Sequence, residues 1–253
     1  MHESNTICLR NLKICRRLLG TDHPETAQAL INVGVVKFII GGRGIVADYF
    51  KEAAWILEDH YGPAHPAVAK AYEWLGTYHE GNADTIPSRK YLWKSYNIWK
   101  KTKGPDHPDL AEIYRYMGLY FKRYWNHDSA LIYFEKAKKM FDQKYGEANF
   151  LSVKCLNNAA DIYAEHDSLE HLVEPTYRQC EQLIKDFPSP NRMAVVMTLY
   201  NRAEYVLNNK KQYKHALHYM NRLLQEYFPG FKATDISDHP EIPKDYYHWI
   251  PHL

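Results

Sequence analysis

The segment Gly20-Thr21-Asp22-His23-Pro24 decides the fold of this chain, because it returns twice at a fixed spacing. Gly62-Pro63-Ala64-His65-Pro66 follows 42 residues later, and Gly104-Pro105-Asp106-His107-Pro108 follows 42 residues after that. The next positions in phase are Gly146 and then Pro188. A fixed period of this length indicates a repeat architecture, in which stacked units share one continuous core.

The residues between these segments predict one helix in the first half of each repeat. Sets of residues recur in phase at the spacing i, i+3 and i+4, which is the period of one helix face. The last residue of each set is small, so we expect two helices to cross closely there. The sets are Leu30, Val33 and Gly34; Tyr72, Leu75 and Gly76; Tyr114, Met117 and Gly118; Leu156, Ala159 and Ala160.

A second helix is predicted in each repeat by sets at the spacing i, i+4 and i+7. These sets are Val46, Phe50 and Ala53; Ser88, Leu92 and Ser95; Ala130, Phe134 and Ala137. Residues that favour turns separate the two predicted helices at Gly41–Gly44, Gly81–Asp84 and Asn126–Asp128. Each repeat is therefore predicted to be an antiparallel pair of helices.

The linkers between pairs have a residue pattern that suits a helix junction. Glycine ends the preceding helix in a conformation that other residues avoid, and proline starts the next one. Asp22 and Asp106 are placed to cap the new helix. The histidines of the linkers, His23, His65 and His107, occupy equivalent places in different repeats. We expect them to pack at the junctions and to bind no metal.

This pattern resembles the tetratricopeptide repeats of the 42-residue type, which occur in kinesin light chains and nephrocystin-3-like proteins. Their Gly-x-x-His-Pro linker is present, and their Leu-Asn-Asn-Leu-Ala motif is matched best by Leu156-Asn157-Asn158-Ala159-Ala160. The resemblance implies an all-α, right-handed superhelix of about five helix pairs over residues 1–228. Its repeat junctions lie near 20, 62, 104, 146 and 188, and an irregular cap or tail covers 229–253.

The same resemblance implies a non-catalytic scaffold or adaptor that binds a peptide or a partner helix in its concave groove. The predicted groove residues, which we expect to face solvent, are Gln28, Ile31, Lys70, Glu73, Thr77, Glu112, Arg115, Leu119, Lys154, Asn157, Asn158 and Asp161. Their charges have both signs, so they predict no charge for the ligand. A structural array in a larger protein or assembly is the first alternative, and regulation of an enzyme domain outside this sequence is the second.

A basic stretch over residues 88–103 offers a weaker alternative, because basic residues among aromatic rings can bind RNA or anionic lipid. Its candidate residues on the convex face are Arg89, Trp93, Tyr96 and Lys100, and we expect Trp93 and Tyr96 to be exposed. Packed rings under a solvated helix face explain the same pattern, and we favour that explanation.

Composition excludes several other classes. The 253 residues have a net charge of +2, so no nucleic-acid partner is expected. The four cysteines form no Cys-x-x-Cys pair, and we find no catalytic motif, no metal or cofactor motif, no secretory signal and no segment for membrane insertion. We therefore expect a cytoplasmic protein without enzymatic activity or cofactor, whose partner is a protein or a peptide.

The N-terminal end of the array is predicted to carry apolar residues on its outer face. Ile7, Ile14 or Cys15 would lie there, although terminal repeats need a polar outer face to stay soluble. We therefore expect this end to be covered, either by further chain or by self-association.

Overall fold

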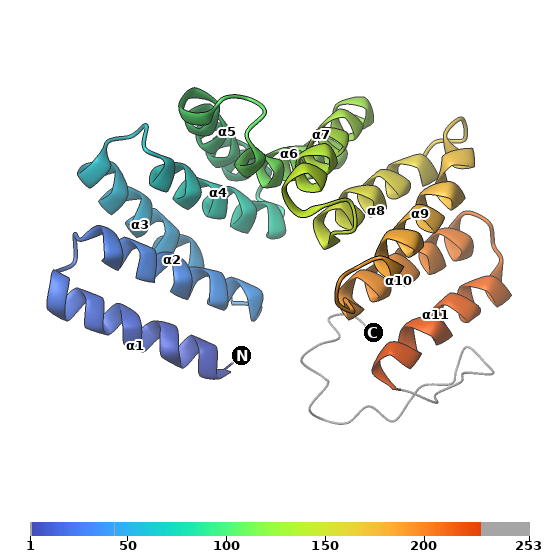
Figure 1. Cartoon of the computed structure of the whole chain (residues 1–253), viewed down its shortest axis with the longest axis horizontal. Coiled ribbons are helices and arrows are strands. Elements are labelled where there is room, and N and C mark those ends of the chain that lie inside the picture. The colour runs from blue at the N-terminus through green and yellow to red at the C-terminus, as the bar shows by residue number, and fades with distance from the viewer. Residues whose placement is uncertain (1, 43, 229–253) are drawn as a thin grey trace. The chain divides into compact units, whose positions relative to one another are not determined.

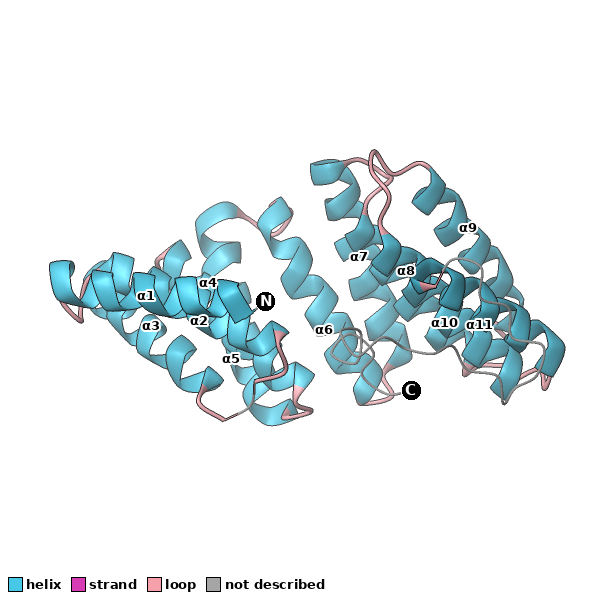
Figure 2. Ribbon diagram, turned by 90° about the horizontal axis from the view of Figure 1, so that it is seen from below, coloured by secondary structure: helices cyan, strands magenta, loops and turns pink. Residues whose placement is uncertain are grey.

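The computed structural model describes residues 2–42 and 44–228, and all regular structure in these residues is helical (Figure 1; Figure 2). The predicted cap or tail over 229–253 and Arg43 of the predicted first turn lie outside the described residues. The chain divides into two compact units, Met1–Gly146 and Glu147–Leu253. The division falls at the repeat junction predicted near residue 146, but the sequence did not predict that the array divides there.

The first unit consists of one leading helix and three helix pairs. Helix α1 packs on α2, and the pairs are α2 with α3, α4 with α5, and α6 with α7. A short 3-10 turn, Pro108–Leu110, leads into α6. The helices are α1 (His2–Leu19), α2 (Pro24–Ile39), α3 (Val46–Tyr61), α4 (Pro66–Gly81), α5 (Thr85–Lys103), α6 (Ala111–Arg123) and α7 (His127–Tyr145).

The second unit contains two further pairs. Helix α8 packs on α9, α10 packs on α11, and α8 also contacts α10, as the first helices of neighbouring repeats do in the first unit. The helices are α8 (Phe150–Ala164), α9 (Val173–Lys185), α10 (Arg192–Asn208) and α11 (Tyr213–Tyr227).

Each pair in the first unit closes where a glycine of its first helix meets a large side chain of its second helix. A Cβ atom added at Gly118 would lie 2.6 Å from the Phe134 ring, closer than packed carbon atoms approach. The predicted small and large positions therefore contact each other. The equivalent contacts are Gly34 with Phe50, at 2.6 Å, and Gly76 with Leu92, at 2.7 Å.

Two of the linker histidines, His23 and His65, cap the helices that follow them. His23 Nδ1 accepts a hydrogen bond from the Glu25 amide at 3.1 Å, and His65 Nδ1 accepts one from the Ala67 amide at 3.2 Å. The prediction that the histidines lie at helix junctions is confirmed, but the prediction that Asp22 caps α2 is wrong. His23 is itself the N-cap residue of α2, so its imidazole lies close to the amides of the first turn.

We expect the His23→Ala substitution to lower the free energy of unfolding by about 0.5–2 kcal/mol, the usual effect of removing an N-cap acceptor. His23→Asn restores an acceptor and should recover most of the loss. Asp22→Ala is the matched control and should change stability by less than about 0.5 kcal/mol, as exposed substitutions usually do. Urea unfolding of the three variants measures this, and a larger effect at Asp22 would assign the cap to the aspartate.

Candidate binding site

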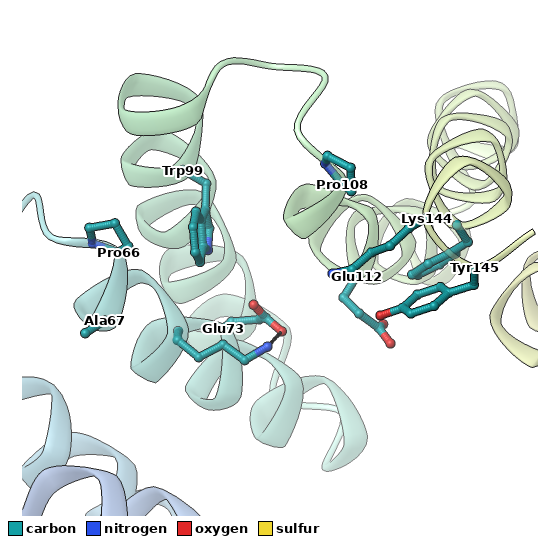
Figure 3. A pocket seen from close by; sticks show the side chains of 10 residues that line it. Pro66, Ala67, Glu73, Trp99, Pro108, Glu112, Lys144 and Tyr145 are labelled. Carbon is teal, nitrogen blue, oxygen red and sulfur yellow. Dashed lines mark hydrogen bonds and ion pairs between the residues drawn. The ribbon is translucent and has the colours of Figure 1, made fainter. Parts of the chain in front are cut away.

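Three of the predicted groove residues, Lys70, Glu73 and Glu112, line one pocket in the first unit (Figure 3). The pocket has a volume of about 380 Å³. Its other lining residues are Pro66, Ala67, Trp99, Pro108, Phe141, Lys144 and Tyr145. A volume of this size lies within the range that small ligands and single side chains occupy.

The pocket is built from equivalent positions of two successive repeats. Pro66 and Pro108 are 42 residues apart; Pro66 begins α4, and Pro108 begins the 3-10 turn that leads into α6. Lys70 and Glu112 are equivalent in the same way, one turn further along these helices, and so are Trp99 and Phe141 on the second helices. The repeat itself therefore brings residues from α4, α5, α6 and α7 to one place.

Two ion pairs of opposite polarity lie at this pocket. Lys70 Nζ lies 2.6 Å from Glu73 Oε1 on α4, and Arg115 Nε lies 2.8 Å from Glu112 Oε2 on α6. The two pairs occupy equivalent positions, with the basic residue first in one repeat and second in the next. Each carboxylate that lines the pocket is thus matched by a cation on its own helix.

The buried member of each pair is held by its surroundings. Glu73 is 5% exposed and Arg115 is 4% exposed. The Arg115 guanidinium lies 4.1 Å from the centre of the Tyr116 ring, a cation–π distance. Burial raises the pKa of the Tyr116 hydroxyl above its ordinary value, and the positive charge of Arg115 opposes that rise. Arg115 is therefore held in its buried position by neighbours on its own helix, α6.

The expectation that all predicted groove residues face solvent is wrong for five of them. Polar side chains on a first helix were expected to face an open groove, but the packed helices of the unit cover them. The buried residues are Ile31, Glu73, Thr77, Arg115 and Asn157. Thr77 illustrates the cause, because its hydroxyl donates to the Glu73 carbonyl of the preceding turn at 2.8 Å.

Asn157 has a structural position in the second unit. Its Nδ2 donates to the Val153 carbonyl and to Thr198 Oγ1, each at 3.0 Å, so it joins α8 to α10. Asn158 Nδ2 donates to the Lys154 carbonyl of its own helix at 2.9 Å. The second unit also contains Asp161, which accepts from Asn201 at 3.3 Å. The amide groups of Asn157 and Asn201 therefore join α8 to α10, and peptide binding by the predicted groove residues of this unit stays a prediction.

The remaining predicted groove residues of the first unit lie outside the pocket lining. Gln28 is exposed and donates to Asn32 on its own helix at 3.1 Å, while Leu119 is half-buried. Gln28 is nevertheless the equivalent of Lys70 in the preceding repeat, 42 residues earlier. It therefore provides a matched position for testing the pocket.

Trp99 is the pocket residue that sequence reasoning missed as a binding residue. Its place in the core register predicted packing alone, and it is indeed 7% exposed. The side chain also reaches into the pocket (Figure 3), and its ring lies parallel to that of His107, with 6.5 Å between the ring centres. Its equivalence to Phe141 was the available signal, because both residues lie in the last turns of the second helix of a repeat.

The aromatic residues of the basic stretch on α5 are less exposed than predicted. Arg89 and Lys100 are exposed, as a solvated face requires, but Trp93 and Tyr96 are half-buried. Trp93 packs edge-on against Tyr120, with 5.8 Å between ring centres. The rings of this stretch therefore pack against α6, and the expectation that both stand exposed is wrong.

Other candidate sites were tested on the described residues. In residues 2–42 and 44–228, no cluster of three or more His, Cys, Asp or Glu side chains could hold a metal ion. No described helix has the length and apolar character that crossing a bilayer requires. On α1, Ile7 and Ile14 are 58% and 53% exposed, and Cys15 is half-buried. Whether another chain covers this face stays a prediction.

Comparisons with known proteins agree with this geometry. A tetratricopeptide repeat family model matches residues 67–143, which include all pocket residues except Pro66, Lys144 and Tyr145, and a second such model matches residues 1–25. No curated protein matches the chain.

Solved structures share the fold at low sequence identity. The crystal structure of BtubC (BKLC) from P. vanneervenii is 12% identical, with a TM-score of 0.71, and the match covers 96% of this chain and 97% of that chain. A putative kinesin light chain from Podosopora anserina with nearly identical TPR-like repeats is 11% identical, with a TM-score of 0.60. That match covers 81% of this chain and 98% of the other.

The predicted fold class is confirmed by these matches and by the helix pairs of both units. Proteins built from this repeat act in general as non-catalytic scaffolds for protein interactions. Tetratricopeptide repeat models thus match two segments of this chain, and its helix pairs share the fold of a putative kinesin light chain with TPR-like repeats.

Proposed function

We propose that this chain is an adaptor that binds a segment of a partner protein in the pocket between α4 and α6. The observation that carries the proposal is the convergence of Lys70, Glu73 and Glu112 with Trp99 in one pocket. These residues combine apolar surface, hydrogen-bonding groups and both charge signs. Specific ligand pockets combine such features, whereas an array with a purely structural role does not require them.

The size of the pocket favours a peptide over a large cofactor. A volume of about 380 Å³ accepts one or two amino-acid side chains, while the rest of an extended segment crosses the neighbouring surface. A repeat array offers further equivalent positions along such a segment, because successive first helices lie side by side. The half-buried Leu119 and the exposed Gln28 are candidates for these additional contacts.

The proposal includes a cytoplasmic location and the absence of catalytic activity. The four cysteines form no Cys-x-x-Cys pair, and Cys155 and Cys180 are buried, which supports an intracellular compartment, where thiols stay reduced. A cytoplasmic adaptor needs no cofactor, and the lining residues suffice to hold a polypeptide.

The Lys70→Ala and Tyr145→Ala substitutions together are expected to weaken partner binding at least tenfold. Both side chains are exposed at the pocket, so their removal deletes contact surface and a charged hydrogen-bond donor. Because Lys70→Ala also removes the cation that is paired with the buried Glu73, a thermal melt checks that the variant stays folded. Partners captured from a cell extract by wild type and by the variant are compared by quantitative mass spectrometry. Calorimetry with the enriched partner then gives the change in affinity.

Two matched controls make this experiment specific. Gln28→Ala removes the residue equivalent to Lys70 in a repeat outside the pocket, and it should leave the affinity within about twofold. Arg89→Ala with Lys100→Ala removes charge from the basic face of α5. Loss of binding in this second control alone, with steep salt dependence, would move the site to that face and favour an anionic ligand.

A further inference from the structure

We propose that the residue entering this pocket is uncharged and aliphatic, and that a backbone carbonyl beside it accepts a hydrogen bond from Trp99 Nε1. The inference rests on the proposed function, because it names the chemistry of the peptide that the same pocket takes. Three features of the pocket carry it: an unpaired donor, a balance of charges and an apolar wall.

The unpaired donor is the indole N–H group of Trp99. Among the described residues, no acceptor lies within hydrogen-bond distance of Trp99 Nε1, although the side chain is more than nine-tenths buried. A tryptophan N–H group can only donate, and buried ones usually find a partner. The side chain reaches into the pocket (Figure 3), so a ligand that brings an acceptor there supplies the missing hydrogen bond.

The position of this nitrogen requires a small adjustment on binding. Solvent scarcely reaches Nε1, which lies beneath the surface of the pocket. Side chains at binding surfaces commonly change their orientation when a partner arrives, while the backbone stays in place. A tilt of the indole therefore lets the donor meet a carbonyl oxygen.

The balance of charges argues against a charged ligand residue. The pocket lining contains two lysines, Lys70 and Lys144, and two glutamates, Glu73 and Glu112. Glu73 is paired with Lys70 at 2.6 Å, and Glu112 is paired with Arg115 at 2.8 Å. A carboxylate or an ammonium group entering here meets charges of both signs, so the attraction of one is offset by the repulsion of the other. A neutral carbonyl group has no such conflict.

The apolar wall of the pocket selects the side chain beside that carbonyl. Pro66 and Pro108 come from the two linkers, and Phe141 and Tyr145 come from the last turns of α7. These rings present apolar surface, on which an aliphatic side chain is removed from water. Leucine in an extended segment satisfies this requirement together with the neutral carbonyl.

Two small probes that differ only in their C-terminal group, one neutral and one charged, test the proposal on the full chain. N-acetyl-leucine methylamide carries a leucine side chain between two neutral carbonyl groups. N-acetyl-leucine carries the same side chain, but its terminal carboxylate is ionised at pH 7. Each probe is titrated into ¹⁵N-labelled protein at constant ionic strength, and the indole N–H signal of Trp99, assigned from its loss in Trp99→Phe, reports binding.

We expect the methylamide to shift the Trp99 indole signal in a saturable manner, with a dissociation constant of about 1 mM, as is typical of so small a ligand. The carboxylate should bind at least fivefold more weakly. Trp99→Phe keeps an aromatic ring but removes the donor, and it should weaken methylamide binding about tenfold, measured on the signals of neighbouring residues. Trp93→Phe, on the same helix but outside the pocket lining, should leave binding unchanged.

Three results would overturn the inference. Equal or tighter binding of the carboxylate would assign an acidic ligand, and shifts that spare Trp99 would place the probe elsewhere. Absence of binding by both probes would reject the aliphatic ligand. The proposed function fails separately, when Lys70→Ala with Tyr145→Ala retains the captured partner at full affinity. If Trp99→Phe does not fold, the two titrations of the wild-type protein still decide between an uncharged and an acidic ligand.

Discussion

Replacing Phe134 by alanine is expected to lower the free energy of unfolding by about 3–5 kcal/mol, the usual effect of removing a buried phenylalanine ring. Phe134 is 2% exposed, and its ring lies where a Cβ atom at Gly118 would be only 2.6 Å away. The ring thus fills the point at which α6 and α7 approach most closely. Alanine leaves a cavity there that the helices can close only by moving their backbones together.

Tryptophan fluorescence during urea unfolding measures this effect selectively. Five of the six tryptophans, at positions 55, 74, 93, 99 and 125, belong to the first unit. Phe134→Leu is the matched control, because repeat two carries Leu92 at the equivalent position, and it should cost clearly less than alanine. Gly118→Ala should lower stability by about 1–3 kcal/mol through overpacking. A cost below about 1 kcal/mol for Phe134→Ala would contradict the proposed contact.

The helix pairs could be predicted because their determinants recur. Small and large residues at fixed phase encode the crossing of two helices, and the phase is visible in the sequence alone. Gly76 with Leu92 shows this well, because the two residues were predicted as separate small and large positions and meet in the structure. The linker prolines begin α2 and α4 for the same reason, since their place is fixed by local backbone chemistry.

Burial of polar side chains could not be predicted in the same way. Glu73 and Arg115 are charged residues, so their residue types predict that they face solvent. Both are nevertheless buried, because neighbouring helices cover them and each has an ion-pair partner one turn away. Asn157 looked suited to grip a peptide, but its amide group bonds to Thr198, which lies 41 residues further along the chain. A single sequence contains no measure of such contacts between helices.

The pocket could not be predicted from the residue pattern of a single repeat. Three of its residues were expected in the groove, but their convergence with Trp99 depends on how two repeats stack. Trp99 also serves two purposes, because it packs against its surroundings and presents an unpaired donor. The core register of its helix predicts that Trp99 packs, but it does not predict that the indole N–H group lacks a partner among the described residues.

The Arg115→Glu substitution is expected to lower the free energy of unfolding by about 3–5 kcal/mol, the usual effect of breaking a buried ion pair. Arg115 is 4% exposed, donates to Glu112 at 2.8 Å and lies over the Tyr116 ring. Glutamate there would place a second carboxylate one turn from Glu112 and remove the cation–π contact. This expectation replaces the view, based on sequence, that position 115 faces solvent and tolerates a change of charge.

Repeat two supplies the matched control for this change. Its equivalent pair, Lys70 with Glu73, has the opposite polarity, so Glu112→Lys combined with Arg115→Glu copies that arrangement into repeat three. The double variant should recover at least half of the stability that the single variant loses, because the new glutamate regains a cation three residues away. Urea unfolding followed by tryptophan fluorescence compares the two variants with wild type. A single variant within about 1 kcal/mol of wild type, or a double variant no more stable than the single one, would show that the ion pair does not hold α6 in place.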